Sequence, residues 1–325
     1  MKLAVHHPEV VERELAHQPG VAENWQESLL LVWGDPDSGI GGFHRIGHEP
    51  NKGSGDLWSG VVTPRHSFRR DSDRVPVLAG DRAIPRFSLD GHSFTIDDDG
   101  RMVFRIDEPE LTLHLVCEDF APLAPIFAPD QLESVGRSTI SNHLECHGRV
   151  RGRLTIGEDI TEVDALCVRD HSWGPRDWST IVSHRWVAGS FGQDLSFSAI
   201  VMQGLDGRFQ RVGVVMRDGE ALQATAIDIV VALEADGLSH RGGSMHMSLV
   251  DGSEFDIEID TQDGWFFNAY SHIEVDTICR ARTSDGRVGF CDLEVSNGRR
   301  ITDPLAGIRA ATHDGLLARD LVGRR

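Results

Sequence analysis

The sequence predicts a mostly-β fold of antiparallel strands that form barrels or sandwiches, and three observations support this class. Asp-Gly pairs recur along the chain, and this pair favours the tight turn of a β-hairpin because glycine adopts positive φ easily. Polar and apolar residues alternate in several segments between these pairs. Helical periodicity is confined to two short segments, residues 8–17 and 315–322.

The Asp-Gly pairs divide much of the chain into segments of strand length. They occupy positions 90–91, 99–100, 206–207, 218–219, 236–237, 251–252, 263–264, 285–286 and 314–315. Residues 111–115 and 255–259 alternate strictly, which predicts strands with one buried face. Residues 197–202 and 227–233 are more continuously apolar, so we expect inner strands there.

The chain length and two loop-like segments indicate the domain organisation. A chain of 325 residues is long enough for two domains, and we expect them at residues 1–157 and 158–325. Residues 63–85 are rich in proline, arginine and aspartate, and residues 119–137 contain three prolines. Both segments are predicted to be long loops, which in β domains often border a binding site.

The charge balance limits the classes of partner. The chain has 51 acidic and 32 basic residues, a formal net charge of −19. This excess disfavours nucleic acid and anionic membranes, because phosphates are bound by lysine and arginine. We expect a hydrophobic small molecule as ligand and no cofactor. A homodimer is left open.

The cysteines and the apolar segments indicate a cytoplasmic protein. The cysteines are odd in number and lack a Cys-x-x-Cys spacing, which predicts reduced and mostly buried thiols: Cys117, Cys146, Cys167, Cys279 and Cys291. The first residues lack the apolar region of a signal peptide, and no apolar stretch reaches the roughly 18 residues of a membrane span.

Residues 169–178, Arg-Asp-His-Ser-Trp-Gly-Pro-Arg-Asp-Trp, are the densest group of functional side chains. Gly174-Pro175 predicts a turn in the middle of this segment. Asp170 precedes His171, so the carboxylate could orient an imidazole or itself donate a proton if it is desolvated. The alternative is a structural turn in which the charges pair and the tryptophans pack in the core.

This segment resembles the AttH-like family, which includes the hydroxyneurosporene synthase (carotenoid 1,2-hydratase) branch. The segments 143–152, 24–28 and 41–50 are also similar to this family. The resemblance implies two lipocalin-like β domains packed together, with an apolar cavity near their junction. It also implies hydratases that act on isoprenoid double bonds, and cyclases.

The resemblance implies roles for particular residues. Asp170 and His171 would be the acid/base pair, and Glu145 would be a second carboxylate in the same cavity. The remaining expected site residues would bind substrate: Trp173, Trp178, Arg176, Asp177, His143, His184, Trp186 and His44. The tryptophans would shield and stabilise a cation.

Metal and nucleotide motifs are missing from the sequence. His-Glu-x-x-His is absent, and His143 and His147 would lie about 13 Å apart on a strand, too far to share a metal. Met245-His246-Met247 predicts two core methionines and a histidine on the opposite face. The two glycine-rich segments, residues 39–42 and 53–55, lack a strand–turn–helix context, so neither predicts a nucleotide site.

The sequence therefore predicts a cofactor-free hydratase, lyase, isomerase or cyclase acting on a hydrophobic molecule of isoprenoid, steroid or aromatic type. The first alternative is a lipocalin-like carrier that binds such a molecule without changing it. The second is an accessory protein that has a filled barrel and no ligand.

Overall fold

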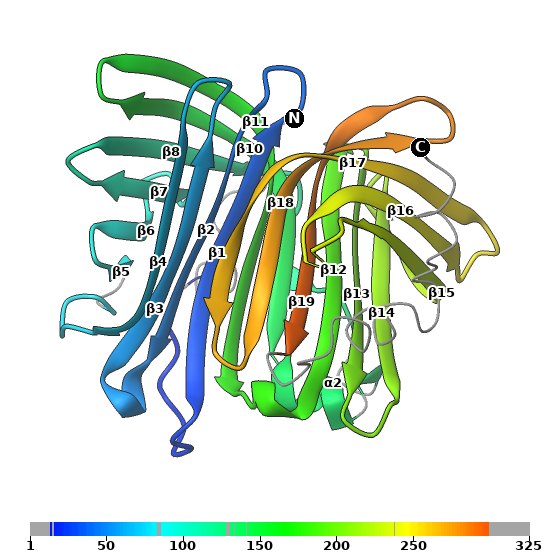
Figure 1. The fold of residues 1–325 in the computed structure, drawn as a ribbon, viewed down its shortest axis with the longest axis horizontal. Helices are drawn as coiled ribbons and strands as arrows, with labels where there is room; N and C mark the ends of the chain where they lie inside the picture. The colour runs from blue at the N-terminus through cyan, green and yellow to red at the C-terminus, as the bar shows by residue number, and fades with distance from the viewer. Residues whose placement is uncertain are drawn as a thin grey trace. The chain divides into compact units, whose positions relative to one another are not determined.

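The computed structural model describes residues 14, 16–82, 86–127, 131–132, 134–140, 142–236 and 238–298. Antiparallel strands dominate it, and they form two compact β units, which confirms the predicted fold class (Figure 1). The first unit holds the described residues of Met1–Asp35, Ile40–Pro125 and Asn142–Arg176. The second holds those of Pro36–Gly39, Ile126–Ser141 and Asp177–Arg325.

The first unit is one sheet with the strand order β4-β3-β2-β1-β11-β10-β8-β7-β6-β5, and β9 pairs with β10. The strands are β1 Trp25–Asp35, β2 Ile40–Glu49, β3 Ser54–Val62, β4 Ser67–Pro76, β5 Arg86–Leu89, β6 His92–Ile96, β7 Met102–Asp107, β8 Leu111–Asp119, β9 Ala124–Pro125, β10 His143–Ile156 and β11 Asp159–Pro175. A 3-10 turn, η1 Pro50–Lys52, joins β2 to β3.

One side of this sheet faces an apolar core. Leu29, Trp33 and Phe104 are each at most 2% exposed and belong to it. The strictly alternating segment 111–115 lies in β8, where Leu111, Leu113 and Leu115 are buried, as predicted. We call the side of the sheet toward this core the inner face and the opposite side the outer face.

The second unit is a closed barrel in which β12 to β19 pair in sequence order and β19 pairs with β12. The strands are β12 Ile181–Gly192, β13 Leu195–Gly204, β14 Phe209–Arg217, β15 Glu220–Leu233, β16 His240–Leu249, β17 Glu254–Ala269, β18 His272–Thr283 and β19 Val288–Gly298. The helix α2 Ser134–Thr139 and the 3-10 turn η3 Trp178–Thr180 also belong to this unit.

Several turn and core predictions are confirmed. Asp90-Gly91 forms a turn with φ of 46° and 82°, the pair of positive angles that a two-residue hairpin requires. Residues 255–259 alternate in β17, and residues 197–202 of β13 are almost continuously buried. Met245 and Met247 are buried in the barrel core, whereas His246 lies on the other face and bonds Asp256.

Three local predictions are wrong. Residues 63–85 contain β4, an edge strand whose charged side chains suit a strand with one neighbour. Asp263-Gly264 is no hairpin turn, because it lies inside β17 next to a register shift, where a Cβ on Gly264 would come within 2.5 Å of the Asp276 carbonyl oxygen. Residues 227–233 alternate between more and less buried positions instead of forming a fully buried strand.

The boundary between the units differs from the predicted division at 157 and 158. That position is the turn between β10 and β11, which pair with each other along their length in the first unit, and the units divide after Arg176. The segment 119–137, predicted as a loop of the first half, holds β9 and the start of α2, and its part after Pro125 belongs to the second unit.

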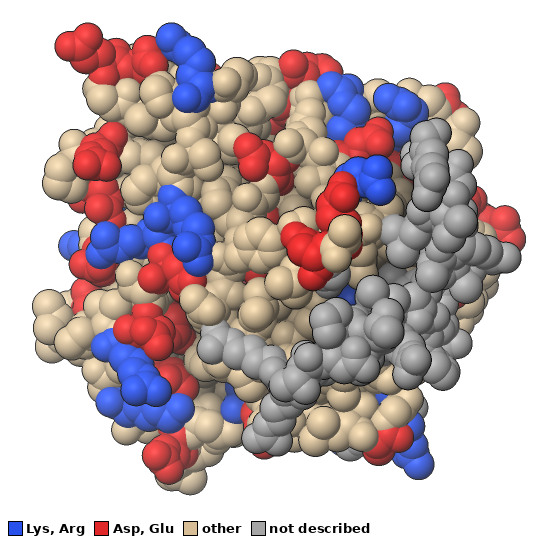
Figure 2. Space-filling model, viewed as in Figure 1, with Lys and Arg blue, Asp and Glu red and all other residues tan. Residues whose placement is uncertain are grey.

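All five cysteines are buried free thiols, as predicted. Among the residues that the structure describes, no helix has the length and apolar composition needed to cross a membrane. The helix expected at 315–322 and most of that expected at 8–17 lie outside the described residues. On the face drawn in Figure 2, basic and acidic side chains of the described residues lie next to one another.

Candidate functional site

The segment singled out in the sequence is mostly strand. Residues 169–175 are the end of β11, which remains paired with β1 up to Trp25 opposite Pro175. The predicted turn at Gly174-Pro175 is therefore wrong, although Gly174 has a φ of 121°. Asp177 follows β11 and accepts a hydrogen bond from the Ser179 backbone N–H at the start of η3.

Strand geometry separates Asp170 from His171. Successive side chains of a strand point to opposite faces, so neighbours in sequence cannot act on one substrate atom from the same side. His171 lies opposite Leu29 and points to the inner face, where Leu29 joins the core. Asp170 points to the outer face. The expected Asp170–His171 acid/base pair is not formed.

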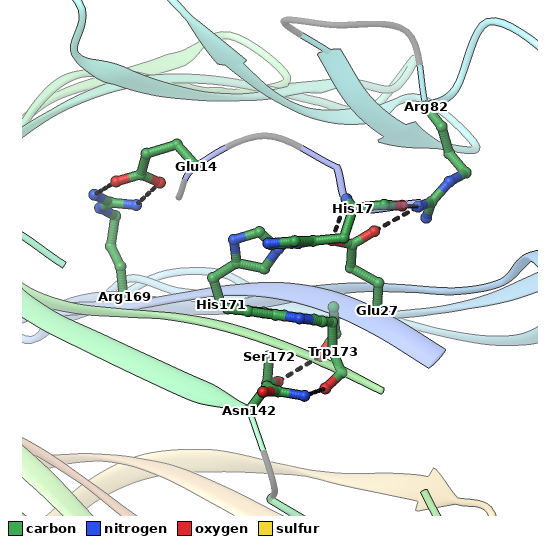
Figure 3. A network of polar contacts seen from close by, with 10 residues as sticks. Glu14, His17, Glu27, Arg82, Asn142, Arg169, His171, Ser172 and Trp173 are labelled. Carbon is green, nitrogen blue, oxygen red and sulfur yellow. Dashed lines mark hydrogen bonds and ion pairs between the residues drawn. The ribbon is translucent and has the colours of Figure 1, made fainter. Parts of the chain in front are cut away.

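His171 belongs to an inner cluster, which we define as His17, Glu27, Arg82, His171 and Trp173 (Figure 3). Glu27 Oε1 accepts a hydrogen bond from the backbone N–H of His17 at 2.8 Å. The same oxygen lies 2.8 Å from Nδ1 of the His17 ring. His171 Nε2 lies 3.0 Å from the same oxygen, and Arg82 pairs with Oε2. The Trp173 ring stacks on His17 at a centroid distance of 3.8 Å.

Both carboxylate oxygens of Glu27 have hydrogen-bond or ion-pair partners within the inner cluster. Burial alone would raise the pKa of Glu27, but hydrogen bonds from His17 and His171 and the charge of Arg82 lower it to about 2. The donor atoms of His17, Glu27 and His171 lie within 4.8 Å of one another, a set that could hold a divalent metal. A metal would have to replace the hydrogen bonds that already join the two imidazoles to Glu27.

Asp170 belongs to an outer cluster, which we define as His143, Glu145 and Asp170. Glu145 lies directly opposite Asp170 in the β10–β11 pair, so both carboxyl groups point to the same face. His143 Nε2 is 2.6 Å from Glu145 Oε1, and His143 Nδ1 is 4.0 Å from Asp170 Oδ2. His143 therefore bridges the two carboxyl groups.

The outer cluster leaves hydrogen-bonding capacity unused. Asp170 is 9% exposed, and its Oδ1 is buried with no hydrogen-bond partner among the described residues. Burial raises the pKa of Asp170, and the charge of Glu145 adds to the rise although His143 opposes it. Burial would lower the pKa of His143, but its hydrogen bond to Glu145 and the charge of that carboxylate raise it.

A row of buried side chains, one of them charged, continues from Asp170 along the outer face. Leu30 of β1 lies opposite Asp170, Arg45 of β2 lies opposite Leu30, and Trp58 of β3 lies opposite Arg45. The Arg45 guanidinium carbon is 4.2 Å from the centroid of the Trp58 ring. No sequence pattern identifies Arg45 or Trp58, because only the strand register brings them to the row of Asp170.

Three of the expected substrate-binding residues have structural contacts in the first unit. His44 is fully buried, bonds Trp33 and Ser59, and stacks on Phe104 at 4.3 Å, so its ring is part of the packed interior of the first unit. Arg176 joins Asn24 through backbone and side-chain hydrogen bonds. Trp173 belongs to the inner cluster.

Apart from His143 of the outer cluster, the other expected substrate-binding residues lie in the second unit. His184 and Trp186 point away from the barrel core, and His184 pairs with Glu294. The Trp186 indole N–H donates to Ser198 Oγ at 3.2 Å. The Trp178 ring lies 5.7 Å from His184. Trp178 and Trp173 thus belong to different units.

The second unit also carries buried acids that the sequence analysis missed. They lie on β18 and β19: Glu274, Asp276, Asp292 and Glu294. Burial, and the charge of nearby carboxylates, raise the pKa of Asp276 and of Asp292 well above the usual range. An alternation of acidic and apolar residues normally indicates a solvated face, so this pattern gave no signal of burial.

Comparison with protein families assigns the chain to one of them. The model of DUF7064, a domain of unknown function, matches residues 11–299. The chain belongs to this family. No curated protein sequence is significantly similar to the chain.

Solved structures share the fold. A Nitrosomonas europaea protein provisionally assigned as AttH has a TM-score of 0.64 at 12% identity, covering 90% of this chain and 98% of that one. CghA, solved with Sch210972, has a TM-score of 0.63 at 11% identity, covering 88% and 94%. Kievitone hydratase from Nectria haematococca has a TM-score of 0.55 at 8% identity, covering 92% and 94%. The predicted resemblance to the AttH-like fold is confirmed.

Proposed function

We propose that this member of the DUF7064 family is a cofactor-free enzyme that uses the outer cluster for acid–base chemistry on a hydrophobic small molecule. The observation that carries the proposal is the pairing of Asp170, a buried carboxyl group with a raised pKa, with Glu145, which is bonded to His143. Titratable groups whose surroundings shift their pKa values are candidates for acid and base roles.

The geometry supports an addition or elimination of water, or an isomerisation. Protonated Asp170 donates its proton to an alkene carbon, which leaves a carbocation. Water adds to the cation, and Glu145 accepts the proton that this water releases. His143 is hydrogen-bonded to Glu145, and its Nδ1 lies 4.0 Å from Asp170 Oδ2, so a small movement of the ring or one bridging water lets it return the proton to Asp170 and close the cycle. The reverse sequence is a dehydration, and loss of a carbon proton without water is an isomerisation.

Several features support a hydrophobic substrate. Leu30, an apolar side chain, lies directly opposite Asp170 on the outer face, where it can contact a hydrophobic molecule bound at the outer cluster. The net charge of −19 disfavours polyanionic substrates. Two proteins of the same fold are named as a hydratase and as a complex with a small molecule. We propose isoprenoid, steroid or aromatic compounds, and a cytoplasmic location because the five cysteines are free thiols.

The test is conversion of a panel of prenylated aromatic compounds, linear isoprenoids and steroids, measured by mass spectrometry in H2O and in D2O. We expect the gain or loss of one water, or an isomer that carries deuterium on carbon. Asp170→Asn should lower kcat by about 10²- to 10⁴-fold, because general acid catalysis contributes that factor. An infrared pH titration should show a carboxyl group that ionises at a higher pH than an ordinary aspartate, and this variant should lack that transition.

Asp164→Asn is the matched control, because Asp164 is also on β11 but 55% exposed and paired with Arg149. It should keep the wild-type rate. Recovery of bound panel compounds unchanged would support the carrier alternative instead. Full turnover by Asp170→Asn would show that the outer cluster is not the acid–base site.

A further inference from the structure

Two buried arginines differ in their partners. Arg169 and Arg185 are each 2% exposed. Arg169 forms ion pairs with Glu14 at 2.9 Å and Asp119 at 2.6 Å, and despite burial these charges raise its pKa well above the usual range. Arg185 has no carboxylate partner among the described residues, and burial lowers its pKa to about 10. Arg185 is therefore a buried cation for which the described residues supply no counter-ion.

The strand register places Arg185 inside the barrel of the second unit. Arg185 lies opposite Val295 of β19 and Val201 of β13. Val295 is part of the barrel core and Val201 packs against it, and residues directly opposite in antiparallel strands point to the same face. The guanidinium is thus on the inward side of the closed barrel.

Polar groups hold the guanidinium in place but do not neutralise it. Its Nη1 donates to the carbonyl oxygens of His184 at 2.7 Å and Ser296 at 3.0 Å, and its Nη2 donates to Asn297 Oδ1 at 3.1 Å. Its Nε is buried and has no hydrogen-bond partner in the part of the chain that the structure describes. A buried charge without a partner is unfavourable, so this arrangement calls for an anion that the described residues do not supply.

The surroundings of Arg185 define the chemistry of that anion. The pKa of nearby His240 is lowered to about 4, first by burial and then by Arg185, so this imidazole is neutral at neutral pH. The inward row that contains Arg185 and Val295 continues through Val275 to Phe266, which is 41% exposed. The row thus runs from an accessible aromatic ring over apolar side chains to a cation. Barrels of eight strands can hold one small ligand.

We propose that the barrel of the second unit binds an apolar molecule with a carboxylate end group, and that Arg185 forms the ion pair with this carboxylate. The site is independent of the outer cluster and needs no catalysis. Arg185 would fix the orientation of the ligand, with its apolar part along the row toward Phe266.

The test compares cis-parinaric acid with the corresponding alcohol by fluorescence titration of the full-length protein. We expect the acid to bind at least about tenfold tighter, because an ion pair replaces an unpaired buried charge. Arg185→Gln keeps hydrogen-bonding groups but removes the charge, and it should abolish this preference while affinity for the alcohol changes less than about twofold. Arg185→Lys should retain part of it.

Arg282→Gln is the matched control, because Arg282 is an exposed arginine of the same barrel. It should bind both probes like the wild type. Equal affinity of the wild type for acid and alcohol, or failure to bind either, would overturn the proposal, and so would full retention of the preference in Arg185→Gln. If that variant does not fold by circular dichroism, the ratio measured on the wild type decides the question.

Discussion

The two faces of β11 both hold buried charged groups, but these groups differ in how many of their polar atoms have hydrogen-bond or ion-pair partners. On the inner face, His171 bonds Glu27, and Arg169 bonds Glu14 and Asp119. On the outer face, Asp170 lies opposite Glu145, and one of its buried oxygens receives no hydrogen bond from the described residues. A satisfied network stabilises a fold, whereas an incompletely satisfied one in a native protein needs another explanation, such as catalysis.

The largest expected effect on stability is that of Glu27→Gln. This change removes the charge that partners Arg82, which is 15% exposed, and weakens the bonds to both histidines. We expect the free energy of unfolding in urea to fall by about 3–5 kcal/mol, as when one partner of a buried ion pair is removed.

Glu145→Gln is the counterpart on the outer face and should change the free energy of unfolding by less than about 1 kcal/mol. The glutamine oxygen can still accept a hydrogen bond from His143, and the substitution relieves the repulsion between Glu145 and Asp170. Equal losses in the two variants would contradict the distinction between the faces.

The pH dependence of stability should have opposite signs for the two faces. The pKa of Glu27 is lowered from 4.5 to about 2, so its contribution is complete above pH 4.5 and is lost as the pH falls toward 2. This loss is on the order of 3 kcal/mol. The Glu27→Gln variant should not show this loss when its free energy of unfolding in urea is measured across the same pH range.

For Asp170 the raised pKa means that the folded state binds more protons than the unfolded state. Stability from this group is therefore greatest at low pH and declines as the pH rises from 3.8 through the raised pKa. Urea titrations across pH should show that Asp170→Asn removes this decline. A decline that persists unchanged in the variant would mean that Asp170 ionises normally.

Ser172→Ala should have the smallest effect on turnover. Ser172 Oγ lies 3.1 Å from Ser28 Oγ in a buried hydrogen bond that involves no charge. We expect a loss of about 1 kcal/mol in unfolding free energy and an unchanged turnover rate. A large loss of turnover with little loss of stability would instead extend the outer cluster to Ser172, the next residue of β11 on that face.

Local sequence patterns predicted much of the fold but less of the site. Asp90-Gly91 and the alternating residues 111–115 were correctly interpreted, because a turn and a strand face depend mainly on neighbouring residues. Asp263-Gly264 was misinterpreted, because the close approach of the Asp276 carbonyl comes from another strand. The acids of β19 were missed, because alternation predicts which side chains share a face and not whether that face is covered.

The sequence by itself determined that the protein is built from antiparallel strands, that its thiols are free, and that residues 169–178 concentrate functional side chains. It also brought Glu145 and Asp170 into one hypothesis through the resemblance to AttH-like proteins. The tertiary structure decided which residues act together. It placed Asp170 with Glu145 and His143, and it gave His171 to the inner cluster. The physical reason is that side chains alternate along a strand, whereas partners across strands depend on register, which pairing of the whole sheet sets.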